Sequence, residues 1–334
     1  MSTSPVAASI AMHFRFHPLL VALVACIALC TPGARAADAH ALLASMADAM
    51  RNLDYQGSFT YQHAGRTDTL RVFHAGGPRE RERIVSLSGP RTELIRDGFN
   101  VTCIQADGSA TVYTRTSRRG LLPLIPDAGG TKLDAHYDVT LAGSDRVAGH
   151  LTDVIDVIAR DQFRYGYRLW LDRTTHLLLR SVVTDTERRW LEQFMFVSVD
   201  IGQSPSESDL VPSQREILTT TSPAPATVVR SRALWKVDSP PPGFAFVSAH
   251  RPLNSTDDAE HLVYSDGLAS VSIYVEPVAA NGLDAEGLLS RGTMHIHSRL
   301  VDDWRITVLG DVPAETVGLF ARTVTRAEPA EAVR

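Results

Sequence analysis

The stretch that decides the fold reads Phe163-Arg164-Tyr165-Gly166-Tyr167-Arg168-Leu169-Trp170-Leu171-Asp172. Successive side chains of a β-strand point to opposite faces, so this alternation predicts a strand with one aromatic and aliphatic face. The residues expected on that face are Phe163, Tyr165, Tyr167, Leu169 and Leu171, and those expected on the other are Arg164, Arg168 and Asp172. An apolar face of this kind needs a cover, and the sequence has few helical patterns to supply one.

Strand patterns surround this stretch on both sides. Residues 151–200 contain four such runs, and Asp97-Gly98 and Asp107-Gly108 are strong hairpin signals between earlier ones. The earlier runs are expected at 56–62, 69–74, 81–87, 92–96, 101–105 and 111–115. An amphipathic helix is predicted over 38–53, whereas 121–136 fits either a short helix or a loop. Consecutive short strands joined by turns predict one large, curled antiparallel sheet.

A second domain is expected after a linker. Without its leader the chain has about 298 residues, more than the ~250 at which single cores usually stop growing. Residues 202–230 are rich in serine and proline, which is typical of an extended connection and makes them the natural hinge. We therefore place the first domain at 37–201 and a smaller α+β domain at 231–334. The second domain is expected to have a closing helix over 313–324 and strands at 245–249, 260–265, 270–276, 293–299 and 304–309.

Residues 1–36 have the order of a secretory signal peptide. A weakly basic start with Arg15 is followed by an apolar run over 19–29 and the small-residue site Ala34-Arg35-Ala36. The apolar run is too short to span a bilayer, so we expect cleavage near Ala36 and export of the mature chain. Two of the three cysteines leave with the leader, and Cys103 alone excludes an intramolecular disulfide.

Composition and motifs argue against several classes of function. Without Arg15 and Arg35 of the leader, 31 basic side chains stand against 38 acidic ones, which argues against a general nucleic-acid binder. The chain has no Gly-x-Ser-x-Gly elbow, no His-Glu-x-x-His and no glycine-rich phosphate loop, so we predict neither an enzyme nor a bound cofactor. His295-Ile296-His297 places two imidazoles on one strand face. Because no third ligand is nearby, a half-exposed strand fits better than a metal site.

Longer motifs carry a family resemblance. In the first domain they are Ile158-Ala159-Arg160-Asp161, the run from Arg164 to Asp172 and Leu191-Glu192-Gln193-Phe194. In the second they are Trp235 before Pro242-Gly243-Phe244, then Arg251-Pro252-Leu253, then the run from Leu262 to Leu268. With these motifs in order from about Ala41 to Val324, the chain resembles the MucB/RseB family of periplasmic negative regulators of an envelope-stress sigma factor. One departure is Leu178, where the family often has proline.

The resemblance implies a location, a fold and a function. It implies a periplasmic protein whose first domain is like the lipoprotein carrier LolA, a half-open β-barrel around an apolar pocket. The second domain, with help from the first, would bind the periplasmic segment of a membrane-anchored anti-sigma factor and shield it from proteolysis. Lipid or lipopolysaccharide fragments in the pocket would release that partner. The alternative function is a lipoprotein or lipid carrier of LolA type, which leaves the second domain without a role. Whether the chain forms a homodimer stays open.

Aromatic side chains of the curled sheet are the candidates for the lipid pocket. They are Phe59, Tyr61, Phe73, Tyr165, Tyr167, Phe194 and Phe196. The alternative is that the helix over 38–53 and the segment 121–136 cover them as an ordinary core. A one-residue shift in register inverts every assignment, so the sequence does not tell which of them share a face.

Charged and aromatic residues elsewhere give two further sets of candidates. The candidates for a pocket rim that meets lipid phosphates are Arg115, Arg118 and Arg119. Aromatic anchors dominate many interfaces, so the candidates for partner contact are Trp235, Phe244 and Tyr264, with the core of the small domain as their alternative place. A further basic cluster consists of Arg79, Arg81, Arg83 and Arg91, and it favours a solvated strand face because Glu80 and Glu82 lie between its arginines. Its alternative is a rim that meets lipid phosphates or an acidic partner segment.

Overall fold

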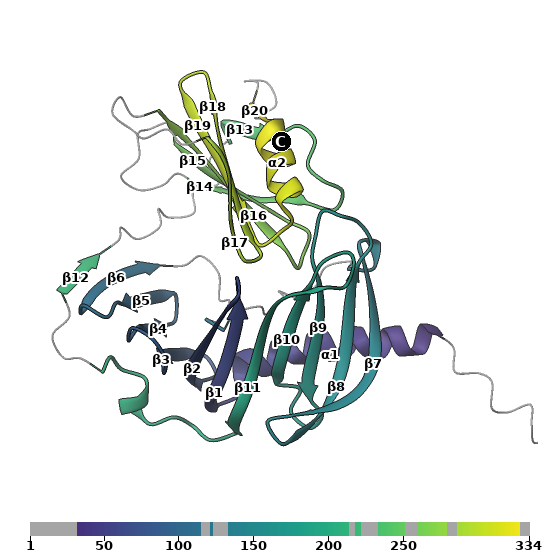
Figure 1. The fold of residues 1–334 in the computed structure, drawn as a ribbon, viewed down its shortest axis with the longest axis vertical. Coiled ribbons are helices and arrows are strands. Elements are labelled where there is room, and N and C mark those ends of the chain that lie inside the picture. The colour runs from purple at the N-terminus through teal and green to yellow at the C-terminus, as the bar shows by residue number, and fades with distance from the viewer. Residues whose placement is uncertain are drawn as a thin grey trace, which may run out of the picture.

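The computed structural model describes residues 32–114, 121–122, 133–213, 218–221, 233–250, 259–278 and 286–327. These residues form two α-helices and two large β-sheets arranged as two domains (Figure 1). Neither α1 (Pro32–Asn52) nor α2 (Ala314–Thr323) is long and apolar enough to cross a membrane. The predicted α+β class is confirmed, with a large open antiparallel sheet, few helices and a smaller second domain. Most of the predicted signal peptide lies outside the described residues.

The first domain is built on one twelve-stranded sheet. Its strands are β1 (Tyr55–His63), β2 (Arg66–Ala75), β3 (Arg81–Ser86), β4 (Glu93–Asp97), β5 (Asn100–Ile104), β6 (Ser109–Thr114), β7 (Tyr137–Val147), β8 (His150–Ala159), β9 (Gly166–Asp172), β10 (Leu178–Thr184), β11 (Trp190–Ile201) and β12 (Leu218–Thr221). They lie in the order β12-β6-β5-β4-β3-β2-β1-β11-β10-β9-β8-β7, and only β12 with β6 is a parallel pair. The end strands β12 and β7 do not pair with each other, so the sheet stays open, as expected of a half-open barrel.

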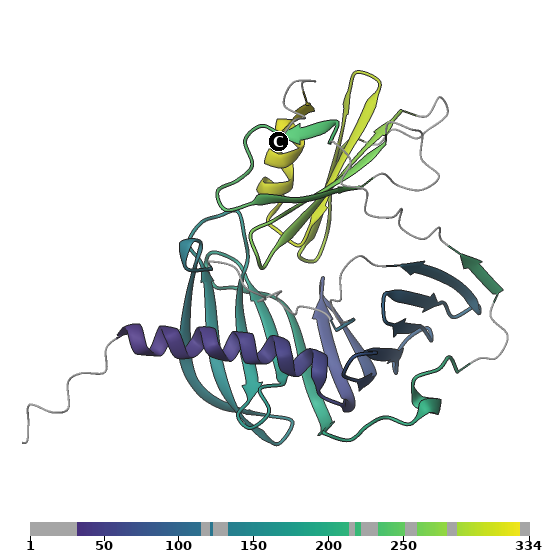
Figure 2. The same cartoon turned by 180° about the vertical axis from the view of Figure 1, so that it is seen from behind.

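Helix α1 covers the inner face of this sheet, which we define as the face that carries Phe59. Figure 2 shows the helix running across the strands from β7 to β11. Leu43 and Met46 of α1 belong to the same hydrophobic core as Phe59 and Phe196. The helix expected over 38–53 therefore covers apolar strands, which was one of the two interpretations that the sequence left open.

The strand in the opening stretch begins later than expected. β9 starts at Gly166, so Phe163 and Arg164 lie in the turn before it. Within β9 the predicted alternation holds, because Tyr167 is buried on the inner face while Arg168 forms an ion pair on the outer face. The prediction that Arg164 shares a face with Arg168 is wrong, because the chain has not yet entered the strand at that position.

The segment that follows β11 lies along the outer face of the sheet. Arg83 donates hydrogen bonds to Oε2 of Glu93 at 2.9 and 3.1 Å and to the carbonyl oxygen of Asp209 at 3.1 Å. The backbone N–H of Ser213 donates to the same Glu93 oxygen at 3.2 Å. The predicted solvated face is therefore wrong at Arg83, because residues from far along the chain cover it. Glu82, on the inner face, is equally buried.

In the twelve-stranded sheet, two strands lie where the sequence analysis placed none. β7 has a polar, exposed second half, so its alternation is visible only over Tyr137, Val139 and Leu141. β12 falls within the segment 202–230 that was predicted to be a linker, and it pairs with β6. Together with the contacts of Arg83, this pairing binds part of the connection to the first domain.

The second domain combines a six-stranded sheet, a two-stranded sheet and α2. Its strands are β13 (Trp235–Val237), β14 (Ala245–His250), β15 (Glu260–Ser265), β16 (Ser270–Pro277), β17 (Gly287–Arg291), β18 (Met294–Val301), β19 (Trp304–Gly310) and β20 (Val324–Arg326). The larger sheet has the order β14-β15-β16-β19-β18-β17, and β13 pairs with β20. Val317 and Phe320 of α2 join Ile273 and Val308 of the sheet in a second hydrophobic core, separate from that of the first domain.

Candidate functional site at the domain junction

Three of the aromatic pocket candidates form one buried cluster. Phe59, Phe194 and Phe196 meet edge to face, with ring centroids 5.1 to 6.0 Å apart. None of the three side chains is more than 1% exposed, and all belong to the core that includes Leu43 and Met46 of α1. An acyl chain can therefore reach these rings only if part of this core, which includes α1, moves.

Tyr61 lies opposite Phe194 at the margin of this cluster, whereas Phe73 lies apart from it. The hydroxyl of Tyr61 donates a hydrogen bond to Oε2 of Glu192 at 2.7 Å. The register of β1 with β2 puts Phe73 on the outer face, opposite to Phe59, and the guanidinium carbon of Arg71 lies 5.0 Å from its ring centre. The structure thus does not bring Phe73 together with the other candidates.

Tyr165 and Tyr167 reach the junction between the two domains. Together with Thr293 and Asp311 of the second domain, they line a small interdomain cleft. Burial raises the pKa of Tyr165 above its ordinary value, and the negative charge of Asp311 raises it further. The phenol therefore stays protonated at neutral pH and remains available as a hydrogen-bond donor.

The three candidates for partner contact lie in the core of the second domain. Trp235 packs edge to face on Trp304, with centroids 5.3 Å apart, and Phe244 packs on Phe320 at 5.5 Å. Tyr264 packs on the same Phe320 at 5.4 Å. Each of the three is at most 5% exposed, so in this structure they occupy the alternative place considered from the sequence, and no surface for a partner is formed by them.

The remaining candidates concern the pocket rim and a metal site. The rim arginines Arg115, Arg118 and Arg119 lie outside the described residues, so the rim stays a prediction. Within the described ranges, no group of three or more His, Cys, Asp or Glu side chains is arranged to hold a metal ion.

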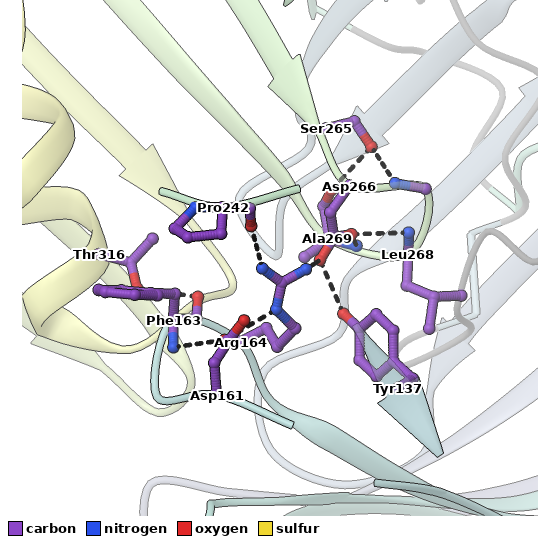
Figure 3. Close-up of polar contacts among 11 residues, drawn as sticks. Tyr137, Asp161, Phe163, Arg164, Pro242, Ser265, Asp266, Leu268, Ala269 and Thr316 are labelled. Atoms are coloured by element: carbon purple, nitrogen blue, oxygen red, sulfur yellow. Dashed lines mark hydrogen bonds and ion pairs between the residues drawn. The ribbon is translucent and has the colours of Figure 1, made fainter. Parts of the chain in front are cut away.

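An ion pair centred on Arg164 joins the two domains (Figure 3). From the turn between β8 and β9, its guanidinium donates to the carboxylate of Asp266 and to the carbonyl oxygen of Pro242. Tyr137 of β7 donates to the same Asp266 oxygen at 2.9 Å, while Asp161 accepts from Nε of Arg164 at 2.9 Å. The side chains of Arg164 and Asp266 are both 0% exposed, so this is a fully buried interdomain pair.

Asp266 serves both the turn and the junction. Its Oδ1 accepts the backbone N–H groups of Leu268 and Ala269 at 2.9 and 2.8 Å, which fixes the turn between β15 and β16. Its Oδ2 faces Arg164 and Tyr137 instead. The Asp-Gly turn predicted from the sequence therefore also positions a carboxylate for the other domain.

The charge state of this network follows from its contacts. Burial alone would lower the pKa of Arg164, but its hydrogen bond with Asp161 and the charge of Asp266 raise that pKa overall. Burial raises the pKa of Tyr137, and the neighbouring charge of Asp266 raises it further. Both donors therefore keep their protons at neutral pH, and the network stays fully hydrogen-bonded.

A second polar contact joins the domains at Glu192 of β11. Its Oε1 accepts the backbone N–H of Thr293 at 2.6 Å, and its Oε2 accepts the hydroxyl of Tyr61. Gly292 approaches so closely that a Cβ there would lie 1.8 Å from Oε1 of Glu192, and its φ of +61° also favours glycine. A side chain at this position would therefore have to displace the carboxylate of Glu192.

Each domain also contributes an apolar residue to the core of the other. Leu268 of the second domain is 2% exposed and belongs to the core of the first. Phe163 of the first domain packs against the core of the second, and its carbonyl oxygen accepts the hydroxyl of Thr316 at 2.8 Å. The domains are therefore docked by reciprocal packing as well as by ion pairing.

The sequence analysis missed the residues that make this junction. Arg164 and Glu192 stood inside motifs of the family resemblance, and Asp266 was assigned to a turn, but none was a candidate site residue. The sequence signal that could have identified them is the presence of charged residues within otherwise apolar motifs. The pairing itself was hidden, because Arg164 and Asp266 are 102 residues apart in the chain.

Both domains match proteins of one family. The family model of the MucB/RseB N-terminal domain matches residues 38–214, and that of the MucB/RseB C-terminal domain matches residues 229–325. The chain is 33% identical over 312 residues to the sigma factor AlgU regulatory protein MucB of Pseudomonas aeruginosa, covering 90% of this chain and 96% of that protein. It is 29% identical over 292 residues to the sigma-E factor regulatory protein RseB of Salmonella typhimurium, covering 85% and 89%.

Solved structures of MucB agree with this match. The complex of Pseudomonas aeruginosa MucA and MucB aligns over 87% of this chain and 99% of the solved chain, with a TM-score of 0.66 and 28% identity. A crystal structure of MucB aligns over 87% and 98%, with a TM-score of 0.62 and 27% identity. Both family models match in order, and MucB of Pseudomonas aeruginosa is 33% identical over 90% of this chain. The chain therefore belongs to the MucB/RseB family.

Proposed function

We propose that this protein is a periplasmic regulator that binds the periplasmic segment of a membrane-anchored anti-sigma factor. The observation that carries the proposal is the match to MucB in its complex with MucA, which extends over 87% of this chain and includes both domains. The sigma-factor regulatory proteins MucB and RseB match the chain over similar lengths. A carrier using only the first domain would leave the docked second domain without a role.

We propose that the bound segment is protected from proteolysis. A protease cleaves a chain that enters its active site in an extended form, so a segment held against a folded protein is withdrawn from cleavage. The reciprocal packing of Phe163 and Leu268 supports this role, because it holds two domains in one fixed arrangement that a partner can span. Such a preformed surface lowers the entropy cost of binding.

We propose that lipid or a lipopolysaccharide fragment releases the partner. The apolar inner face with Phe59, Phe194 and Phe196 is the support for a lipid site, and α1 is the element that an acyl chain would displace. If lipid and partner favour different positions of α1 or of the two domains, each weakens the binding of the other by the same factor. A coupling of about 1–3 kcal/mol would give roughly 5–150-fold weaker binding.

The test uses the mature chain and the periplasmic segment of Pseudomonas aeruginosa MucA, the partner in the solved complex. Binding is measured by calorimetry, and the half-life of the segment is measured with a nonspecific protease, with and without purified lipopolysaccharide. We expect a defined affinity, a longer half-life in the complex and a loss of both on addition of lipopolysaccharide. Binding of lipopolysaccharide without any binding of the segment would support a lipid carrier instead. A half-life unchanged in the complex would contradict protection alone.

A further inference from the structure

The cleft between the domains has walls from both of them. Its volume is about 60 Å³, and it lies where the start of β9 meets the turns of the second domain. Its lining residues are Tyr165, Tyr167 and Val183 from the first domain and Leu268, Ala269, Ser270, Thr293 and Asp311 from the second. The lining thus combines hydroxyl groups and a carboxylate with a few apolar side chains.

Two carboxylates lie at this cleft, Asp311 in its lining and Glu192 next to the lining residue Thr293. Thr293 donates its hydroxyl to Asp311 at 3.3 Å and its backbone N–H to Glu192 at 2.6 Å, so the two carboxylates flank one residue. Glu192 is 4% exposed and accepts only neutral donors, because no cation pairs with it among the described residues. A buried carboxylate without a cation is costly, and a positively charged group nearby would be favourable.

Tyr165 gives a second and independent indication of a ligand. It lines the cleft, is only 7% exposed, and its hydroxyl forms no hydrogen bond with any residue that the structure describes. A tyrosine hydroxyl that faces a cleft and has no protein partner takes its hydrogen bonds from water or from a ligand. A polar group placed in the cleft would supply the missing bond.

We propose that this cleft receives one basic side chain, an arginine or a lysine, from the polypeptide segment that the protein binds. The proposal rests on the proposed function and adds the chemistry by which the partner is recognised. The carboxylate of Asp311, the hydroxyl of Tyr165 and the hydroxyl of Ser270 are the acceptors for its N–H groups, while Leu268 packs against its alkyl chain.

The size of the cleft fits the head of such a side chain. A volume of about 60 Å³ has room for roughly four water-sized groups at ~15 Å³ each. A guanidinium has four non-hydrogen atoms, and its flat face stacks well on aromatic rings such as those of Tyr165 and Tyr167. Arginine therefore fits better than lysine. An anionic lipid headgroup fits worse, because it would lie beside the carboxylate of Asp311.

Occupation of the cleft has a consequence for the arrangement of the domains. Tyr165 and Asp311 contribute to the same cleft from different domains, so a side chain that contacts both binds only while the domains stay docked. A ligand that binds one arrangement stabilises that arrangement by its differential affinity. The basic side chain would therefore hold the two domains in the docked arrangement. Any signal that separates the domains would weaken the binding of the partner segment.

The test is a double-mutant cycle between the cleft and the MucA periplasmic segment. Asp311→Asn is measured against wild type with the segment and with variants that carry each of its arginines and lysines in turn as glutamine. We expect Asp311→Asn to weaken binding roughly 10–100-fold, as loss of a charge-assisted hydrogen bond does. One position of the segment should lose its effect in the Asp311→Asn background. The matched control is Asp303→Asn, an exposed aspartate before the other end of β19, which should leave the affinity unchanged.

Tyr165→Phe separates recognition from a structural role. Because the hydroxyl has no described partner in the free protein, its removal should not lower the free energy of unfolding, yet binding of the segment should weaken several-fold. Equal affinities of Asp311→Asn and Asp303→Asn, or coupling spread evenly over all basic positions of the segment, would overturn the proposal. If wild type binds no form of the segment, the proposed function fails and the inference fails with it.

Discussion

The guanidinium of Arg164 and the carboxylate of Asp266 form an ion pair between two domains, with both side chains completely buried. Burying two charges is expensive unless other polar groups satisfy their remaining hydrogen-bonding capacity. Here Asp161, Pro242 and Tyr137 do so. The pair therefore specifies one docked arrangement, because any shift of a domain leaves a buried charge without its partner.

Arg164→Ala should lower the free energy of unfolding by about 3–5 kcal/mol, because it leaves the carboxylate of Asp266 buried and uncompensated. Urea unfolding followed by tryptophan fluorescence measures this loss. Arg160→Ala is the matched control, since the exposed fractions in its pair with Asp138 are 47% and 54%, and such surface pairs contribute at most about 1 kcal/mol. Equal losses of unfolding free energy in the two variants would contradict a larger contribution from the buried interdomain pair than from a surface pair.

Gly292→Ala should destabilise the junction more than backbone strain alone explains. Both Gly292 and Gly65 have positive φ values, +61° and +74°, so an alanine costs roughly 1–2 kcal/mol at either position. At Gly65 a Cβ meets nothing within 4 Å, whereas at Gly292 it would displace the carboxylate of Glu192. The difference between the two unfolding free energies isolates the steric part, and a difference near zero would contradict the close contact.

The large sheet could be predicted from the sequence because its signal is local. Alternation over Tyr167 to Leu171 and the Asp-Gly turns depend only on neighbouring residues, and the structure follows them. The face of Phe73 could not be predicted, because it depends on the register of β2 with β1, and a shift of one residue reverses it. The burial of Arg83 could not be predicted either, since the chain that covers it comes 126 residues later.

For the candidate site, the sequence predicted which types of residue take part but not which residues lie together. Aromatic residues of the first domain were recognised, but alternation does not distinguish a lined cavity from a core covered by a helix, and α1 decides this for Phe59. Arg164 was placed on the strand face of Arg168 because period-two reasoning does not say where a strand begins. Its true partner, Asp266, is in another domain, and long-range pairing leaves no mark in a local pattern.

Phe194→Ala should cost about 3–5 kcal/mol of unfolding free energy, because its ring is fully buried in the core shared with α1 and its removal leaves a cavity there. A ring that lined an open lipid pocket would cost much less to remove. Phe99→Ala is the control, since Phe99 is 44% exposed and its removal should cost less than about 1 kcal/mol. Similar small losses in both variants would favour an open pocket at Phe194.

Arg83→Ala should lower the free energy of unfolding more than Arg81→Ala does, although the two arginines share one strand face. Arg83 is 9% exposed and pairs with Glu93, which is 3% exposed, so its loss should cost about 3–5 kcal/mol. Arg81 pairs with Glu207, which is 79% exposed, so its loss should cost at most about 1 kcal/mol. Chemical unfolding of both variants measures the difference, and the reverse order would mean that the segment around Asp209 does not cover this face.

His261 should make the second domain less stable in acid. Burial, together with a smaller electrostatic effect of His250, lowers its pKa to about 4, whereas the pKa of an unfolded histidine is near 6.5. Below that value the unfolded chain binds a proton that the folded protein does not, so stability is fully present above pH 6.5 and falls as the pH is lowered toward 4. At pH 5 the loss amounts to about 2 kcal/mol.

His261→Phe isolates this contribution, because a phenyl ring can keep the stacking on Tyr274, whose ring centroid lies 4.2 Å away, and cannot take up a proton. Urea unfolding of wild type and variant is compared at pH 7.5 and pH 5. Carboxylates such as Glu80 and Glu93, whose pKa values are lowered in the folded protein, titrate alike in both proteins and cancel in the difference. The variant should therefore lose less stability between the two pH values than wild type does. An identical loss would mean that His261 accepts its proton as readily in the folded protein as in the unfolded chain.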